Sequence, residues 1–179
     1  FLIYMYIKKN SILHGINFHH FYDNKVYLKG QGAINKNHLR KLIKFIGRHN
    51  IISPDDFLYH INNKNFNLNK VCFTFDDGLR CQYEIAKPIL DEYKIKAFFF
   101  CFTSIFTDKP DMLELYRYFR IKYYSKINDF FFEFFDKFEI LTNLKVNNIL
   151  SKNESKINAQ RKIYKFHSKE DLLFRLIRD

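Results

Sequence analysis

Two apolar runs, separated by a stretch of helical periodicity, constrain the fold of this chain more than any other feature. The first is VCFTF at 71–75 and the second is KAFFFCF at 96–102. Both have the length and composition of buried β-strands. Between them, apolar residues recur every three or four positions, which predicts a helix over 81–93 that is broken or restarted at Pro88. A strand, a helix and a strand in this order predict a parallel βαβ unit of an α/β fold, with the two strands as neighbours.

Two carboxylates and a glycine directly follow the first strand, as Asp76, Asp77 and Gly78. Because side chains alternate along a strand, Asp76 is expected on the same face as Thr74. Residues just past the carboxyl end of a parallel strand line the face where α/β enzymes build their sites, so both carboxylates are expected in a concave pocket. One could then bind a divalent metal while the other acts as a base for water. An ordinary turn uses the same residue types, so the motif alone leaves both interpretations open.

Helices are predicted on both sides of this unit. Upstream, GINFHHFYD has the alternation of a short strand, and Asn35 and Ser53 are placed to cap two helices. Downstream the apolar pattern is helical over 111–141 and again over 168–179, and the polar stretch 145–162 between them is the only candidate for a linker or flexible loop. We therefore predict an α/β domain over 1–110 and a helical insertion or extension over 111–179. These βα units are too few for a complete barrel or doubly wound sheet.

The composition argues for a folded protein and against several partner classes. The chain has 179 residues, of which 47% are hydrophobic, and a formal net charge of +11. The lysines are scattered and accompany no recognised binding motif, which argues against a nucleic-acid partner. An odd number of cysteines, three, favours a reducing compartment, and no apolar stretch reaches the roughly 20 residues that span a bilayer. The expected location is cytoplasmic, with no membrane span. Because position 1 is Phe, we expect the natural start to lie upstream.

The segment VCFTFDDGLRCQYEIAKPILDEYKIKAFFFCF resembles the first motif region of the polysaccharide deacetylase family, carbohydrate esterase family 4. The upstream segment NKNHLRKLIKFIGRHNIISPDDFLYHI resembles the two helices that often precede this motif, so the resemblance covers about residues 15–106. It implies a partial distorted (β/α) barrel with parallel strands, followed here by a helical segment. It also implies a metal-dependent hydrolase, commonly with zinc, that removes N-acetyl or O-acetyl groups from a polysaccharide or amino sugar. Carried over, it makes Asp76 the catalytic base and Asp77 a metal ligand.

The chain departs from the family pattern after this motif. The second motif, HSxxH or HTxxH, supplies histidines to the metal, and its nearest counterpart here is FHSKED, with His167 and Ser168 but Asp171 in place of the second histidine. Ser168 and Asp171 also fit a helix cap, which is the favoured interpretation. We therefore expect the amino-terminal part of a longer enzyme, weak in zinc binding and inactive by itself. The alternative is a catalytically silent carbohydrate-binding or interaction domain.

Two adjacent histidines, His19 and His20, follow the predicted first strand. On a strand only one of them can point toward the site. A core or surface role is favoured for both, and His20 is the candidate for a contact with the substrate. The sugar, the acetyl linkage and the oligomeric state do not follow from the sequence.

Overall fold

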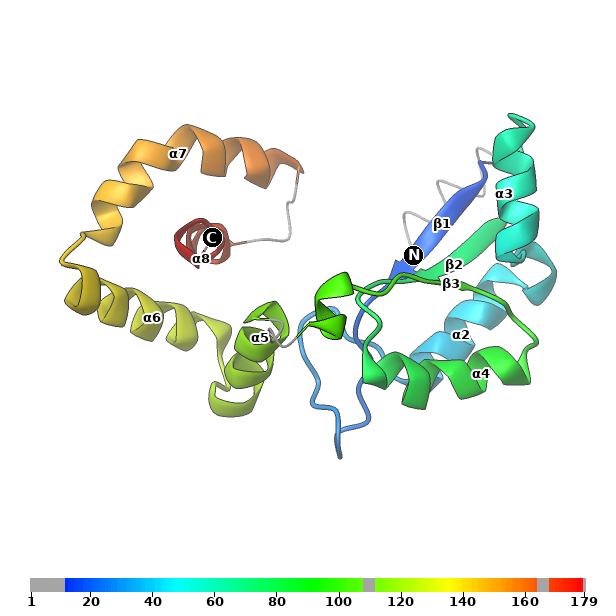
Figure 1. Cartoon of the computed structure of the whole chain (residues 1–179), viewed down its shortest axis with the longest axis horizontal. Coiled ribbons are helices and arrows are strands. Elements are labelled where there is room, and N and C mark those ends of the chain that lie inside the picture. Colours follow the sequence, from blue (N-terminus) through cyan, green and yellow to red (C-terminus); the bar gives the residue numbers. More distant parts are fainter. Residues whose placement is uncertain (1–11, 108–111, 164–167, 179) are drawn as a thin grey trace. The chain divides into compact units, whose positions relative to one another are not determined.

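The structure is a computed structural model that describes residues 12–107, 112–163 and 168–178, with the backbone alone at 104, 105, 163 and 178. It divides into two compact units, Phe1–Leu115 and Tyr116–Asp179. Figure 1 shows the sheet with its helices in the first unit and helices alone in the second. The predicted domain boundary between 110 and 111 lies outside the described residues and stays a prediction.

The first unit contains an open sheet of three parallel strands in the order β1-β2-β3. Its strands are β1 (His14–Phe18), β2 (Val71–Phe75) and β3 (Phe98–Phe99). In the register, Asn17 is opposite Thr74 and Phe18 is opposite Phe75. The predicted parallel pairing of β2 with β3 is therefore confirmed. A barrel is not confirmed, because the described strands form an open sheet with β1 and β3 at its edges.

The second predicted strand, 96–102, is shorter and more exposed than its sequence indicated. Only Phe98 and Phe99 are in β3, and the side chains of Phe99, Phe100 and Phe102 are 44%, 52% and 51% exposed. The expectation of a strand buried on both faces was wrong. The physical reason is its position, since β3 is an edge strand and pairs only with β2 among the described residues.

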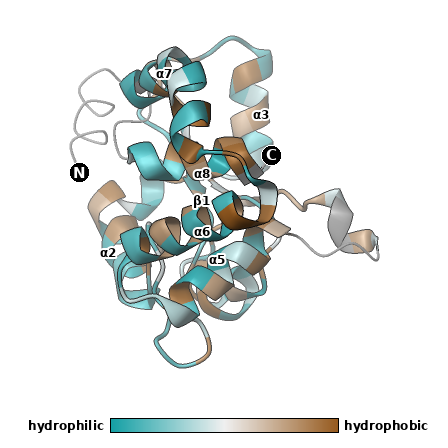
Figure 2. Ribbon diagram, turned by 90° about the vertical axis from the view of Figure 1, so that its left-hand side faces the viewer, coloured by the Kyte–Doolittle hydropathy of each residue, from teal (hydrophilic) through white to brown (hydrophobic). Residues whose placement is uncertain are grey.

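Some of the helices of the first unit pack on one face of the sheet. They are α2 (Lys36–Ile46), η1 (Arg48–Asn50), α3 (Pro54–Asn62), η2 (Gln82–Ala86), α4 (Lys87–Glu92) and η3 (Thr103–Phe106). Both predicted caps are present: the Asn35 side chain accepts from the N–H of His38 at 2.9 Å, and Ser53 Oγ accepts from that of Asp56 at 3.1 Å. In Figure 1, α2 and α4 lie side by side next to the sheet, and Figure 2 shows the alternating apolar and polar stretches of α2.

A single apolar core joins α2, η2 and α4 to one face of β1 and β2. Alternate residues of β2 point into it, and so do the apolar positions of the helices. The core consists of Phe18, Phe21, Leu39, Ile43, Ile46, Ile51, Val71, Phe73, Phe75, Cys81, Ile85, Ala86, Ile89, Leu90 and Ile95. Asn17 and Thr74, at alternate positions of β1 and β2, are therefore on the opposite face of the sheet.

The helix predicted over 81–93 is present and contains one widened turn. Residues Gln82–Ala86 form the π-helical turn η2, in which the N–H of Lys87 donates to the carbonyl of Gln82, five residues earlier. Pro88 follows directly, and proline has no N–H to donate to the carbonyl four residues earlier. The predicted break is thus a local widening, after which the helix continues as α4.

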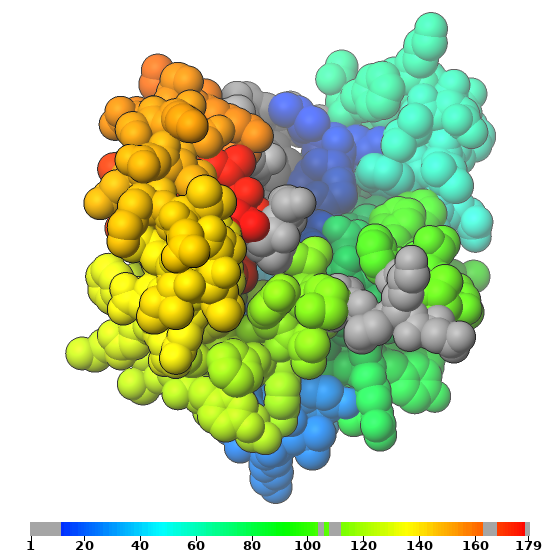
Figure 3. All heavy atoms as spheres, turned by 60° about the vertical axis from the view of Figure 1, so that its left-hand side comes forward, coloured from blue at the N-terminus to red at the C-terminus, as the bar shows by residue number. Residues whose placement is uncertain are grey.

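The second unit is helical. Its elements are α5 (Met112–Tyr123), which begins in the first unit, α6 (Ile127–Thr142), α7 (Val146–Ile163) and α8 (Lys169–Arg178). The expectation of a linker or flexible loop at 145–162 was wrong, because this polar stretch forms α7, which packs through its few apolar residues. Leu172 and Leu173 of α8 pack with Val146 and Ile157, while Phe174 packs with Phe130 and Phe131. Figure 3 shows the outer surface of α6 and α7 in yellow and orange. None of the described helices combines the length and apolarity needed to cross a membrane.

Burial separates the three cysteines into two classes. Cys72 and Cys81 are buried, whereas Cys101 is exposed, and all three are free thiols. Burial raises the pKa of Cys72 to about 11, and it also raises the pKa of Cys81. Only the thiolate reacts readily with disulfide reagents, so burial and a raised pKa both protect these two side chains.

We expect one thiol, that of Cys101, to react rapidly with Ellman's reagent in the folded protein at pH 8. The other two should react only after unfolding in guanidinium chloride. The Cys101→Ala variant is the control, and its folded form should lose the rapid phase. A rapid phase equivalent to two or three thiols would contradict the burial of Cys72 and Cys81.

Candidate active site

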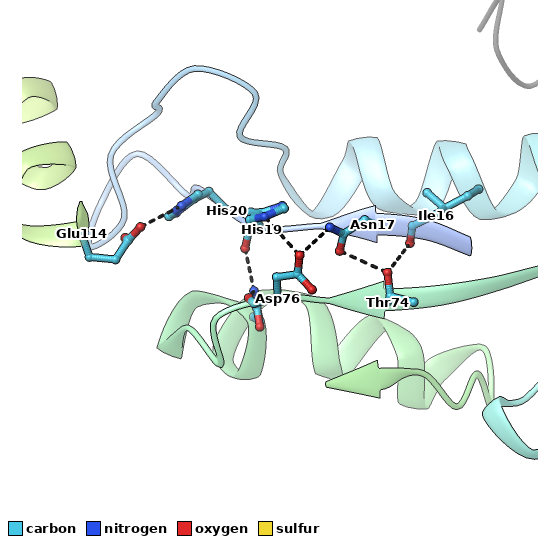
Figure 4. A network of polar contacts seen from close by, with 8 residues as sticks. Ile16, Asn17, His19, His20, Thr74, Asp76 and Glu114 are labelled. Atoms are coloured by element: carbon cyan, nitrogen blue, oxygen red, sulfur yellow. Dashed lines mark hydrogen bonds and ion pairs between the residues drawn. The ribbon is translucent and has the colours of Figure 1, made fainter. Parts of the chain in front are cut away.

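The site is built around Asp76, the first residue after β2. Its N–H donates to the carbonyl of Phe18 at 3.0 Å, which extends the ladder between β1 and β2 by one hydrogen bond. Its Oδ2 accepts from Nδ2 of Asn17 at 2.6 Å and lies 3.3 Å from Nε2 of His19. Figure 4 shows these contacts converging on the carboxylate from the end of β1. The Asp76 side chain is 35% exposed, so water can reach it.

Thr74 fixes the orientation of the Asn17 amide. Its hydroxyl lies 3.1 Å from Oδ1 of Asn17 and 3.4 Å from the carbonyl of Ile16 (Figure 4). A hydroxyl that donates to Oδ1 leaves the Asn17 NH₂ group facing Asp76. The side chains of Thr74, Asn17 and Asp76 thus form a connected polar row, as the predicted common face of Thr74 and Asp76 requires.

Asp77 and Gly78 form a tight turn after Asp76. Both have positive φ, 73° at Asp77 and 62° at Gly78, the left-handed values seen at the centre of a type I′ turn. A Cβ at Gly78 would lie 3.1 Å from Sγ of Cys101, so the backbone of the turn approaches the chain after β3 closely. The backbone of the motif therefore forms a turn at Asp77 and Gly78. The side chain of Asp76 belongs to a polar network with Asn17 and His19. The predicted concave pocket stays a prediction.

Gly78→Ala is expected to destabilise the fold by about 1–3 kcal/mol, because left-handed φ is unfavourable for alanine and the added methyl crowds Cys101. Gly32→Ala is the matched control: Gly32 also has positive φ, 74°, but its Cβ would meet nothing within 4 Å. Urea unfolding of both variants separates backbone strain from crowding. Combining Gly78→Ala with Cys101→Ala should recover part of the loss, and equal losses for Gly78 and Gly32 would contradict the crowding.

The two histidines point to different partners. His19, the more exposed of the two, is the one beside Asp76. The side chain of His20 is only 13% exposed, and its Nε2 lies 3.2 Å from Oε1 of Glu114, an ion-pair distance without hydrogen-bond geometry (Figure 4). The predicted contact of His20 with a substrate stays a prediction, whereas His19 is the histidine that this geometry connects to Asp76.

The segment FHSKED, the nearest counterpart of the second metal-binding motif, contains a helix cap. Ser168 Oγ accepts from the N–H of Asp171 at 3.1 Å, at the start of α8, as the favoured interpretation required. The Asp171 carboxylate also lies 3.3 Å from Nε of Arg175, one turn later on the same helix. His167 lies outside the described residues.

A metal site is not complete in the described part of the chain. No three His, Cys, Asp or Glu side chains are grouped there as metal ligands. A catalytic zinc site usually takes three protein ligands and keeps one position for water. The role of Asp77 as a metal ligand is thus not tested by this structure.

Sequence reasoning missed two residues of this network, Asn17 and Gln82. Asn17 could have been found, because the alternation in GINFHH places it on the face opposite Ile16 and Phe18, in line with Thr74. Gln82 left no comparable signal. Its Nε2 donates to two backbone carbonyls, of Asp76 at 2.6 Å and of His19 at 2.8 Å, and such contacts depend on tertiary structure.

Comparison with known proteins supports the resemblance that the sequence indicated. Residues 63–120 match the model of the family described as polysaccharide deacetylase, which is less than half of the chain but contains β2, the turn, α4 and β3. A solved structure described as a de-N-acetylase from Aggregatibacter actinomycetemcomitans is 22% identical, with a TM-score of 0.43. That alignment covers 55% of this chain and 40% of the other. The search of curated proteins found no match.

Proposed function

Because residues 63–120 have the polysaccharide deacetylase pattern, we propose that the chain is part of a hydrolase that removes N-acetyl or O-acetyl groups from a polysaccharide or amino sugar. The observation that supports this most directly is the position of Asp76. Its carboxylate lies at the carboxyl end of a central parallel strand, contacts Asn17 and His19, and remains open to water. A general base needs this combination of fixed orientation and access to the attacking water.

The chain's own residues account for one proton transfer in such a reaction. Asn17 donates to Oδ2 of Asp76, which holds the carboxylate in one orientation. His19 places an imidazole nitrogen 3.3 Å from the same carboxylate oxygen. Both of these contacts use Oδ2 of Asp76, and Oδ1 is the oxygen that we assign to the attacking water.

We also propose that a divalent metal, zinc in the first instance, binds through Asp77 together with side chains outside the described residues. These would belong to chain beyond Asp179, which makes the present sequence the amino-terminal part of the enzyme. The proposed partner is a carbohydrate substrate.

The experiment compares the 179-residue chain with the product of the reading frame continued past Asp179. Acetate release from N-acetylated chitooligosaccharides and zinc binding by calorimetry are measured for both proteins. We expect the longer protein to release acetate and bind zinc, and the shorter one to bind zinc weakly without releasing acetate. Oligosaccharide binding by the longer protein without acetate release from N- or O-acetylated sugars would contradict the proposed hydrolase. Tight one-to-one zinc binding by the short chain would contradict the proposed ligand set.

A further inference from the structure

Gln82 is a buried polar residue that the proposed reaction does not use. Its side chain is among the most buried in the protein, at 1% exposed. Its Nε2 donates to the carbonyl of Asp76 at 2.6 Å and to that of His19 at 2.8 Å. One amide group thus connects the backbone after β1 to the backbone after β2, next to the two side chains that meet in the site.

The ladder between the two strands ends at this point. Its last hydrogen bond runs from the N–H of Asp76 to the carbonyl of Phe18. Beyond it the two strands separate. His19 begins the loop that leads to α2, and Asp76 leads into the turn at Asp77 and Gly78. Among the described residues, the carbonyls of His19 and Asp76 therefore have no N–H of the opposite strand to accept from. The two N–H groups of the Gln82 amide donate to them instead.

The orientation of the amide follows from its surroundings. A glutamine has two donors on Nε2 and two acceptor lone pairs on Oε1. Turning the amide over would bring Oε1 against two carbonyl oxygens, so the contacts to His19 and Asp76 require Nε2 where it is. Oε1 is buried and has no hydrogen-bond partner among the described residues. A buried acceptor without a partner is unfavourable, and its retention here is compatible with a role for the donor end.

The widened turn η2 places Gln82 at its first position, where the carbonyl of Gln82 accepts from the N–H of Lys87. π-Turns of this kind occur often at functional sites. Two neighbours of Gln82 hold the loop that follows His20: Sγ of Cys81 accepts from the N–H of Phe21 at 3.5 Å, and Glu84 accepts from the Tyr27 hydroxyl at 2.8 Å. The segment 81–84 therefore holds the chain at the carbonyl of His19 and again after His20.

We propose that Gln82 is a positioning residue that sets the separation of His19 and Asp76 by binding both of their carbonyls. Its structural role stands on the geometry alone. Its effect on turnover rests on the proposed function. Loss of the two hydrogen bonds should loosen the end of the β1–β2 ladder without affecting its beginning.

Two substitutions of similar size test this role. Gln82→Met keeps the length of the side chain and removes both donors. Gln82→Glu also removes both donors above the pKa of the introduced carboxyl and restores one donor below it. Burial should raise that pKa above the ordinary value of about 4.3. The loosening of the strand ends by Gln82→Glu should therefore be smallest at acidic pH and should grow as pH rises through the raised pKa. The loosening by Gln82→Met should not change with pH.

Hydrogen exchange of the Asp76 amide is the main measurement, since it needs no enzymatic activity. In Gln82→Met we expect exchange about tenfold faster at Asp76. The amide of Ile52, which donates to the carbonyl of Val71 at 2.9 Å at the other end of β2, is the internal control and should be unchanged. Gln160→Glu, on α7, controls for the added charge in the Gln82→Glu comparison.

Unchanged exchange at Asp76 in Gln82→Met would overturn the proposal, and so would an equal increase at Asp76 and Ile52, which would indicate general destabilisation. In the longer protein the same variant should lower kcat about tenfold while KM stays within about twofold. An inactive wild-type protein would refute the proposed function and leave the exchange result to decide the role of Gln82.

Discussion

Asp76→Asn in the longer, active protein is expected to lower kcat for acetate release by about 10²- to 10⁴-fold, the usual contribution of a general base. Asparagine has nearly the same shape and can still accept from Nδ2 of Asn17 through its side-chain oxygen. It cannot take a proton from the attacking water. The structure around it should therefore persist while turnover is lost, which separates a chemical role for the carboxylate from a structural one.

The measurement is acetate release together with circular dichroism and zinc binding for each variant. Asp91→Asn is the matched control, because Asp91 is an exposed carboxylate of α4 that pairs with Lys87, and its loss should leave kcat unchanged. Retention of zinc by Asp76→Asn would agree with the assignment of the metal to Asp77. An Asp76→Asn variant with nearly full activity would eliminate Asp76 as the base.

Phe75→Ala is expected to destabilise the first unit by about 3–5 kcal/mol, the range for a phenylalanine removed from a packed core. Phe75 is fully buried, and its ring centroid lies 5.1 Å from that of Phe18, 6.0 Å from that of Phe21 and 4.6 Å from that of Phe99. Its removal leaves a cavity that rings from three other segments cannot fill without breaking their own contacts. Such a loss is a large part of the roughly 5–15 kcal/mol that stabilises an ordinary domain.

Urea unfolding followed by circular dichroism measures this effect. Phe106→Ala is the matched control, since its side chain is 81% exposed and truncation should change the free energy of unfolding by no more than about 0.5 kcal/mol. Similar losses for the two variants would mean that the aromatic packing around Phe75 contributes little. Because Asp76 follows Phe75 directly, we also expect faster hydrogen exchange at the Asp76 amide in Phe75→Ala.

Local sequence patterns predicted the elements of the βαβ unit well. The apolar run at 71–75 and the helical spacing after it gave β2 and the helix ending in α4, because both patterns report which face of an element is buried. The run at 96–102 was misleading. Its composition is that of a buried strand, yet how many of its residues pair depends on neighbouring strands that a local pattern does not contain.

The residues of the site that lie on β1 and β2, or directly after β2, were predictable from strand alternation. Asp76 could be placed because β2 leads directly into it, and Thr74 and Asn17 share its face through the strand register. His19 and His20 could not be assigned by alternation, because β1 ends at Phe18 and the direction of both side chains is set by the loop. The two carbonyl contacts of Gln82 lie outside any local pattern for a further reason, since they depend on how the end of β1 meets the turn after β2.

The exposed aromatic edge at β3 has a consequence for handling the protein in solution. Its outer side has no strand partner among the described residues, and the side chains of Phe99, Phe100 and Phe102 are about half exposed there. Unpaired backbone groups next to exposed apolar side chains are a template for aggregation between chains. Crystallisation or spectroscopy at high concentration would therefore benefit from a lysine in place of Phe100, a charge of the kind that natural sheet edges use to prevent such pairing.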